Sequence, residues 1–206
     1  MNAQPPRVLV LGIGNLLWAD EGFGIRCVEA LAAGYDLPES VTLMDGGTQG
    51  LYLLPYVTEA SHLLVFDAID YGLEPGTIKR VRGDEVPRFM GAKKMSLHQT
   101  GFQEVIASAA LVDGLPQEMV LIGVQPAELE DFGGSLREPV RACLPRVLEA
   151  AVTVLREWGV DVRPRDGGAE RLNAAPLSIH DYEAGRPSEA EACRIGDARF
   201  MPGGAG

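Results

Sequence analysis

The sequence predicts an α/β protein: a single three-layer α/β/α domain with a twisted, mostly parallel five-stranded sheet and helices on both faces. Two observations predict this fold class. Short apolar runs alternate along the chain with segments whose apolar residues have helical spacing. The first apolar run, residues 8–11, stops at the glycine turn Gly12-Ile13-Gly14, and a helical pattern follows the acidic pair Asp20-Glu21. A strand, a loop and a helix in this order form the first unit of such a sheet.

The remaining elements follow the same alternation. Strands are expected at residues 7–11, 41–44, 62–66, 76–82 and 118–124, and the fourth alternates as a half-exposed strand does. Helices are expected at residues 22–33, at 51–57, from Ser96 or Thr100 to about residue 111, and at 136–157, the last entered near Pro139 and bent near Pro145.

The chain divides into two parts by composition. Its 206 residues suffice for one sizeable core, which we place at residues 1–163. Residues 164–206 are rich in Gly, Ala, Pro, Arg and Glu and carry only isolated apolar side chains. Such a segment buries too little apolar surface to offset its ordering entropy. We therefore expect a C-terminal tail that is disordered or that serves as a docking arm on a partner.

Charge and cysteine content narrow the classes of partner. The net charge of −11 disfavours binding to nucleic acid or to an anionic membrane surface. The chain has no signal-peptide pattern and no apolar run long enough to span a membrane. Cys27, Cys143 and Cys193 are odd in number and far apart, which indicates reduced thiols and a cytoplasmic protein.

Two carboxylates fall where strands meet helices. Asp20 suits the N-cap of the helix at 22–33, whereas Glu21 either complements the helix dipole or has a function, because Gly22 and Gly24 beside it weaken a first helical turn. Asp67 directly follows a buried strand, where a carboxylate is costly unless it is paired or binds a metal.

His98 is the histidine of most interest. Ser96 and Gln99 form a capping box, which places His98 in the first turn of a helix. The helix dipole there favours the neutral imidazole that ligates metals, although an exposed histidine fits the same position. Strand-to-helix junctions meet at one edge of a doubly wound sheet, so Glu21, Asp67 and His98 are expected together. Two carboxylates and an imidazole suit a divalent metal and leave coordination positions open.

Asp45-Gly46-Gly47-Thr48 ends the second strand at the same predicted edge. This segment is either a tight turn with an Asp cap or a wall of the same cleft that contacts a peptide backbone. Gly12-x-Gly14 begins like a dinucleotide fingerprint, but Leu17 stands where the third glycine belongs, and the chain contains no HExxH.

Five motifs in this order resemble the hydrogenase maturation endopeptidases, which process the large subunit of nickel–iron hydrogenases. They are GIGNLLWADEGFG, DGGT at 45–48, DA at 67–68, SLHQTG at 96–101 and IGVQP at 122–126, and the resemblance covers about residues 7–160. The form with DGGT and a long tail is most similar to the proteases of membrane-bound uptake hydrogenases. The tail lies outside the common pattern.

The resemblance implies an activity and a site. It implies an aspartic-type, metal-dependent endopeptidase that removes a C-terminal peptide from the large-subunit precursor after nickel insertion. Its metal ligands would be Glu21, Asp67 and His98, with Glu21 or Asp67 as the catalytic carboxylate, and Asp45, Gly46 and Gly47 would bind substrate. Nickel would arrive already bound to the precursor. Two alternatives stay open at this point: a non-catalytic nickel-checking chaperone of the immature large subunit, and a nucleotide-binding domain that uses Gly12 and Gly14.

Overall fold

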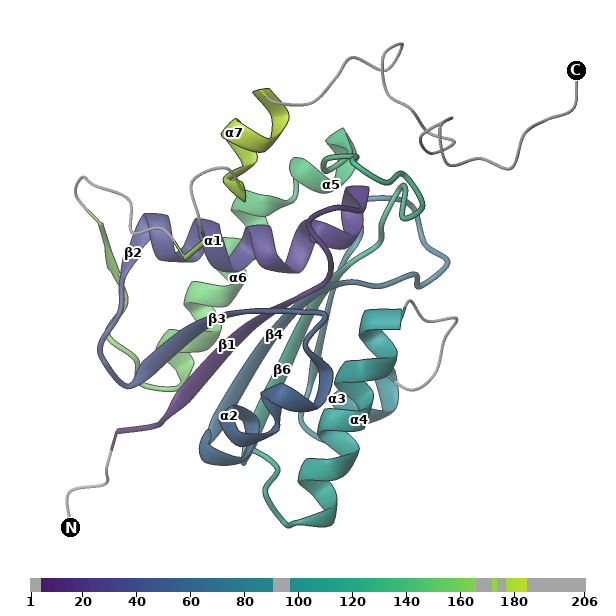
Figure 1. Ribbon diagram of the computed structural model, residues 1–206. Helices are drawn as coiled ribbons and strands as arrows, with labels where there is room; N and C mark the ends of the chain where they lie inside the picture. The colour runs from purple at the N-terminus through teal and green to yellow at the C-terminus, as the bar shows by residue number, and fades with distance from the viewer. Residues whose placement is uncertain (1–4, 91–96, 166–171, 174–176, 185–206) are drawn as a thin grey trace, which may run out of the picture.

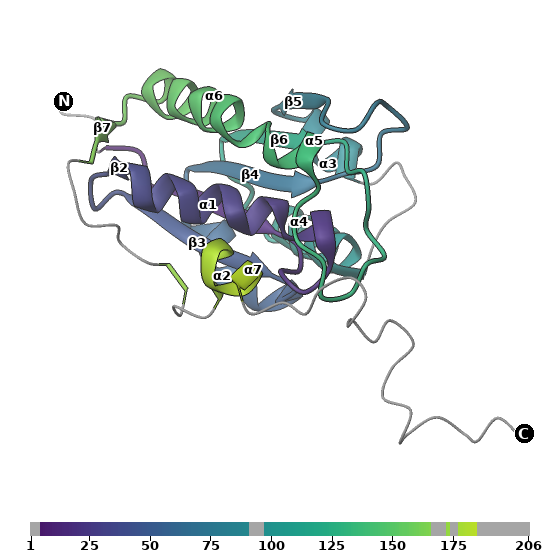
Figure 2. The same ribbon diagram turned by 90° about the horizontal axis from the view of Figure 1, so that it is seen from above.

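The computed structural model describes residues 5–90, 97–165, 172–173 and 177–184. Within these ranges, residues 88–90 and 97–100 are described by their backbone. The described chain forms three layers, with a twisted sheet between two layers of helices (Figure 1). In the view from above in Figure 2, α1 and α6 lie over the sheet. The predicted fold class is thus confirmed.

The sheet has five strands in the order β3-β1-β4-β6-β5. The first four strands in this order, β3, β1, β4 and β6, run parallel. The edge strand β5 is antiparallel to β6. All five predicted strands are present, with small differences at their ends. Their bounds are Val8–Ile13 (β1), Val41–Gly47 (β3), His62–Ala68 (β4), Ile78–Arg82 (β5) and Glu118–Val124 (β6).

Two hydrophobic clusters fill the space between the layers because side chains along each buried strand alternate between the two faces. On one face, Val10 and Leu64 pack with α1 and α6. On the other, Leu11 and Val65 pack with α2 and α4. The covering helices are α1 (Phe23–Gly34), α5 (Glu138–Arg141) and α6 (Leu144–Glu157) on the first face, and α2 (Leu54–Glu59), α3 (Glu85–Met90) and α4 (Leu97–Leu111) on the second.

The single bent helix expected at residues 136–157 was wrong. The chain forms two helices there, and each has a proline, Pro139 or Pro145, within its first two positions. Proline is tolerated in a first turn because the N–H groups there have no partner within the helix, so these prolines begin helices and do not bend one. The helix α3 was not predicted, nor was the short pair of strands β2 (Tyr35–Asp36) and β7 (Arg163–Pro164).

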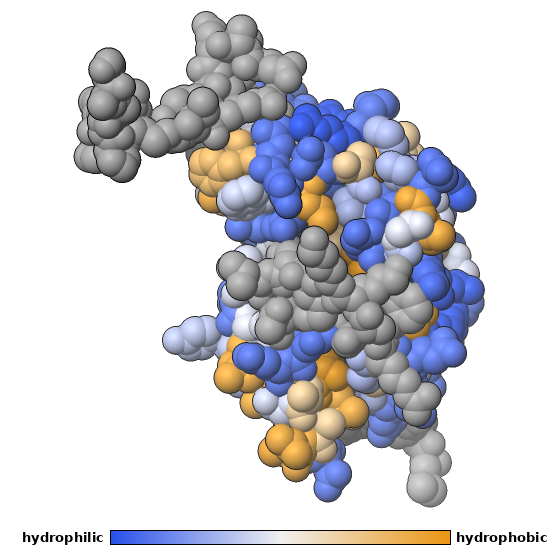
Figure 3. All heavy atoms as spheres, turned by 90° about the vertical axis from the view of Figure 1, so that its right-hand side faces the viewer, coloured by the Kyte–Doolittle hydropathy of each residue, from blue (hydrophilic) through white to orange (hydrophobic). Residues whose placement is uncertain are grey.

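The segment after residue 163 contains described parts that contact the domain. Strand β7 pairs with β2, and the backbone N–H of Arg165 donates to the carbonyl of Gly34 at 2.9 Å. A short helix, α7 (Ile179–Ala184), follows. Among the described residues, no helix is both long and apolar enough to cross a membrane. On the face shown in Figure 3, apolar side chains lie in separate small groups among hydrophilic ones.

Candidate active site at the carboxyl edge of the sheet

The loop after β1 carries Glu21 and is held by close backbone contacts. Gly14 has φ +139°, a conformation that side chains disfavour, and a Cβ there would lie 1.8 Å from the carbonyl oxygen of Glu21. The same carbonyl accepts the N–H of Asn15 at 3.1 Å. A short 3₁₀ turn, η1 (Ala19–Gly22), then leads into α1. The glycine at position 14 therefore lets the loop close on itself and fixes the backbone of Glu21.

Two further glycines bring the start of α1 directly against the strand ends. A Cβ at Gly24 would lie 2.3 Å from the carbonyl oxygens of both Ile13 and Phe66, and one at Gly12 would lie 2.4 Å from the carbonyl oxygen of Gly24. Only glycine permits backbones to approach this closely. As a result, the η1 turn, which contains Glu21, packs against β4 at the start of α1.

Asp67 is the penultimate residue of β4 and is fully buried, with 0 % of its surface exposed. By strand alternation it shares the face of Leu63 and Val65, which pack with α4. It lies in register with Gly123 of β6, where a Cβ would lie 2.0 Å from the hydroxyl oxygen of Tyr71. Burial and, second, the charge of Asp67 raise the pKa of Tyr71, so a neutral hydroxyl faces this end of the strand.

Gln125 and Asp70 fix the loop that follows Asp67. The Gln125 carbonyl oxygen Oε1 accepts the N–H groups of Tyr71 at 2.7 Å and Leu73 at 3.1 Å, and its Nε2 donates to Asp70 at 3.0 Å. Gln125 belongs to the IGVQP motif, yet sequence reasoning gave it no role. Its position could have indicated a role, because Gln125 comes directly after β6, at the same edge of the sheet as Asp67.

His98 is the second residue of α4, which confirms its predicted place in a first helical turn. Three residues on, Gly101 packs on Gly50, since a Cβ at Gly101 would lie 3.4 Å from the Gly50 α-carbon. Gly50 begins η2 (Gly50–Leu53), just after β3, so the start of α4 lies at the same edge as the strand ends. The predicted capping residue Ser96 and the side chain of His98 lie outside what the structure describes.

Asp45, Gly46 and Gly47 end β3 at this edge. The register between β1 and β3 shifts here, with Gly12 opposite Asp45 and Ile13 opposite Gly47, so Gly46 is the extra residue of a bulge. Gly47 has φ +44°. Burial raises the pKa of the half-buried Asp45, and the hydrogen bond from Asn173 opposes that rise.

Asp45 and Asp67 end two strands that are separated by β1. Gly12 is in register with both Asp45 and Phe66, so Asp45 is two strands away from the end of β4. By strand alternation Asp45 shares the face of Phe66, which packs with α1, whereas Asp67 belongs to the opposite face, so the two carboxylates point to different sides of the sheet.

A polar network links Asp45 to the C-terminal segment, a contact that sequence reasoning missed. Asn173 donates to Asp45 at 2.9 Å and to Glu29 at 3.1 Å, and Glu29 pairs with Arg26 at 2.7 Å. Arg26 is only 5 % exposed and also donates to the carbonyl of Leu177. The described residues 172–173 and 177–184, which we call the arm, therefore pass along α1 (Figure 2).

The N-cap role expected for Asp20 was wrong. Gly22 occupies the N-cap of α1, and the carboxylate of Asp20 instead accepts backbone N–H groups of Ala127, Glu128 and Arg137. The carboxylate binds this loop and not the first turn of α1, because the tertiary structure brings three N–H groups of the loop onto it.

The three predicted ligands are chemically suited to a divalent metal ion. Glu21 and Asp67 offer oxygen ligands and His98 would add an imidazole, a set that suits a divalent ion. Among the side chains that the structure describes, which do not include His98, no three His, Cys, Asp or Glu residues are grouped so as to hold a metal ion. The triad thus stays a prediction, supported by the shared edge.

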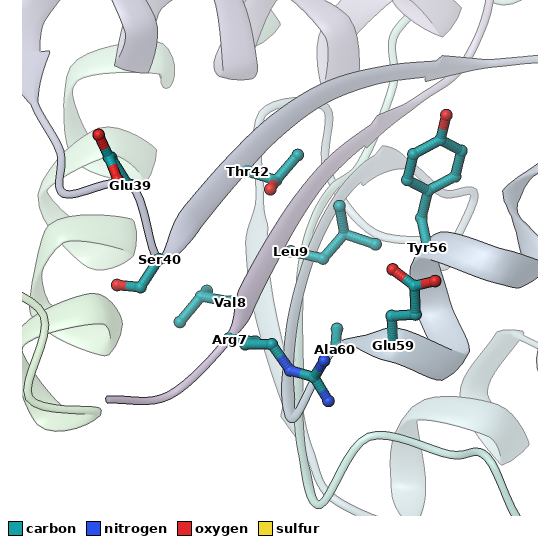
Figure 4. Close-up of a pocket in the computed structure, with 9 residues that line it drawn as sticks. All are labelled: Arg7, Val8, Leu9, Glu39, Ser40, Thr42, Tyr56, Glu59 and Ala60. Carbon is teal, nitrogen blue, oxygen red and sulfur yellow. The ribbon is translucent and has the colours of Figure 1, made fainter. Parts of the chain in front are cut away.

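The pocket drawn in Figure 4 lies elsewhere. Its walls come from the first residues of β1 and β3 and from α2, at the amino ends of the parallel strands, and include Arg7, Ser40, Tyr56 and Glu59. Ligands of open α/β sheets bind at the carboxyl ends, where Glu21 and Asp67 lie.

Fold and site together define an α/β protein with buried carboxylates at the carboxyl edge of its sheet. A family model described as hydrogenase maturation protease matches residues 25–154. The hydrogenase expression/formation protein HoxM of Azotobacter vinelandii is 65 % identical over 96 % of this chain and 95 % of its own, and HupD of Rhodobacter capsulatus is 58 % identical over 98 % and 96 %. The structure of the hydrogenase maturating endopeptidase HybD from Escherichia coli has a TM-score of 0.73 and 40 % identity, covering 77 % of this chain and 98 % of its own.

The chain belongs to the hydrogenase maturation protease family and is a peptidase. The alignments with HoxM and HupD include most of residues 164–206, whereas the match to HybD covers less of this chain. The C-terminal segment is therefore shared with HoxM and HupD, as expected for the form with a long tail, and lies outside the residues that the family model matches.

Proposed function

We propose that this protein is the endopeptidase that removes a C-terminal peptide from the nickel-loaded large-subunit precursor of a nickel–iron hydrogenase. The observation that carries the proposal is the convergence of three chain segments at one edge of the sheet. The loop that bears Glu21, the buried Asp67 at the end of β4 and the first turn of α4 with His98 all lie there. Family membership supplies the reaction type.

Nickel belongs to the substrate in this proposal. The ion is held by the precursor, and Glu21, Asp67 and His98 complete its coordination shell. Three protein ligands leave positions open, so the ion can keep its precursor ligands. Binding the metal also places the neighbouring peptide bond beside the carboxylates, and such proximity is worth several kcal/mol of activation free energy. A precursor without nickel lacks this contact and is left uncut.

Glu21 or Asp67 acts as general base toward the attacking water, and the metal ion polarises the water or the scissile carbonyl. Asp67 is buried near the neutral Tyr71 hydroxyl, whereas Glu21 is half-buried in η1. Asp45, Gly46 and Gly47 flank the pair and dock the peptide backbone. Cys27 and Cys143 are free thiols, as suits a protein that acts on its precursor in the cytoplasm.

The test is a mass-spectrometric processing assay with nickel-loaded and nickel-free precursor. Loss of one C-terminal peptide from the loaded form alone supports the proposal. Binding without a change in mass would assign the protein to the chaperone class instead.

Glu21→Gln should abolish processing and leave the thermal melting temperature near that of the wild type, because the change removes a charge and keeps the shape. The matched control is Glu59→Gln, which changes an exposed carboxylate at the opposite edge of the sheet and should process normally. Normal trimming by Glu21→Gln would contradict the metal-site model.

A further inference from the structure

Asp20 is fully buried, and its carboxylate binds one distant loop, residues 127–137, which we call the rim loop. Oδ2 accepts the N–H groups of Ala127 at 2.8 Å and Glu128 at 2.9 Å, and Oδ1 accepts that of Arg137 at 2.7 Å. The N–H of Asp20 also donates to the carbonyl of Glu128 at 3.1 Å. A single residue thus joins both ends of the rim loop to the loop that follows β1.

The residues before Asp20 extend this connection. Trp18 forms an antiparallel bridge with Phe132, and their rings meet edge to face with centroids 5.4 Å apart. The N–H of Gly133 donates to the carbonyl of Leu17 at 2.6 Å. Between the two attachments Ala19 has φ +32°, a conformation disfavoured for any residue with a Cβ. Contacts on both sides therefore hold this stretch in a backbone shape that it would not adopt alone.

Glu21 follows Asp20 directly in the chain, so the contacts that fix Asp20 also restrict the position of Glu21. The N–H of Glu21 donates to the carbonyl of Trp18 at 2.8 Å, so its backbone is bonded to the stretch that the rim loop holds. Because η1 also contacts β4, a displacement of Asp20 would change the separation between Glu21 and Asp67.

The chemistry of the contact requires a carboxylate. Both oxygens of Asp20 face N–H donors, and a buried carboxylate accepts two or three such bonds more favourably than any neutral group. In asparagine, one of the two positions would present an NH₂ group to an N–H group, so at least one bond would be replaced by a repulsive contact.

We propose that Asp20 is a positioning residue of the protease: by joining the rim loop to the loop after β1, it fixes Glu21 at the place from which it contacts the precursor's nickel. This role rests on the proposed function of Glu21. Asp20 itself touches neither the precursor nor the metal.

The test compares tag-free Asp20→Asn with the wild type and with Asp84→Asn, which makes the same change at an exposed turn. Amide hydrogen exchange at residues 127, 128 and 137 should become faster in Asp20→Asn. The affinity for Ni²⁺ alone, measured by calorimetry, should fall roughly tenfold or more, as it does when residues that orient metal ligands are removed. The kcat for nickel-loaded precursor should fall by a similar factor at a temperature where the variant is folded. Asp84→Asn should match the wild type throughout.

A role in stability alone predicts another pattern. If Asp20→Asn exchanges faster at the rim loop and melts lower, but keeps the Ni²⁺ affinity and the kcat of the wild type, the positioning role is refuted. Unchanged amide exchange would refute it as well. Failure of the wild type to shorten the precursor counts against the proposed function only, because the exchange and Ni²⁺ measurements need no cleavage.

A second variant covers the case in which Asp20→Asn does not fold. Phe132 is 65 % exposed, so Phe132→Ala loses little buried surface while it removes the ring that packs on Trp18. The same connection is then loosened from the rim-loop side, with Asp20 in place. We expect a smaller loss of Ni²⁺ affinity and kcat in the same direction, and wild-type values for both would refute the proposal.

Discussion

Replacing Gly24 by alanine should damage the protein at the point where α1 meets the sheet. A methyl group at Gly24 would lie 2.3 Å from the carbonyl oxygens of Ile13 and Phe66, which belong to two different strands. Neither oxygen can rotate away, because both are backbone atoms. Favourable contact needs about 3.5 Å, so the start of the helix must retreat by roughly 1 Å.

The size of the effect follows from this displacement. Overpacking of this kind costs about 1–3 kcal/mol, and the better helix propensity of alanine returns at most about 1 kcal/mol. The net loss is therefore up to about 3 kcal/mol, and because each kcal/mol shifts the melting temperature of a chain of 206 residues by about 2–4 °C, we expect a fall of up to about 12 °C. Activity should fall more steeply, by about 10²-fold, because a 1 Å misplacement of catalytic groups costs that much.

The same helix contains the matched control. Gly34 ends α1, and a Cβ there would meet nothing within 4 Å, so Gly34→Ala should leave stability unchanged or raise it by up to about 1 kcal/mol. Both variants should be compared by thermal unfolding and by the precursor-processing assay. If Gly24→Ala has the same melting temperature as Gly34→Ala and cleaves the precursor at the wild-type rate, the close contact between α1 and the strand ends does not position the site.

Two further predictions concern the polar network between α1, β3 and the arm. Burial raises the pKa of Asp45, so its ionisation destabilises the folded state as the pH rises above the unfolded value of about 3.9. Asp45→Asn should therefore have a higher melting temperature than the wild type at neutral pH, and the difference should vanish below about pH 4. A difference that does not change with pH would show that it does not come from the ionisation of Asp45. Arg26→Ala should cost about 2–4 kcal/mol, because it removes the cation that pairs with the half-buried Glu29 and the donor to the Leu177 carbonyl. It should also speed proteolysis within the arm, and an unchanged cleavage rate would show that Arg26 does not hold the arm.

Much of the fold was readable from local pattern. Apolar runs indicated four of the five strands of the main sheet, since buried strands must be apolar on both faces when helices cover both, and the alternation of residues 76–82 indicated the edge strand β5. The glycine pattern around Gly12, Gly14 and Gly24 marked the loop of the first unit. The helix start expected near Pro139 was right, but Pro145 misled, because a residue that bends a helix in its interior is also favoured in a first turn.

By itself, the sequence determined the layers of this protein and the short set of residues from which its site is built, because periodicity and junction position are local properties of the chain. Only the tertiary structure decided which of those residues share a place. It set Asp45 two strands from Phe66, gave Asp20 to the rim loop in place of the helix N-terminus, and linked Asn173 to Asp45 across α1. Such contacts join residues more than 100 positions apart, so they depend on strand order and loop closure, which no local pattern encodes.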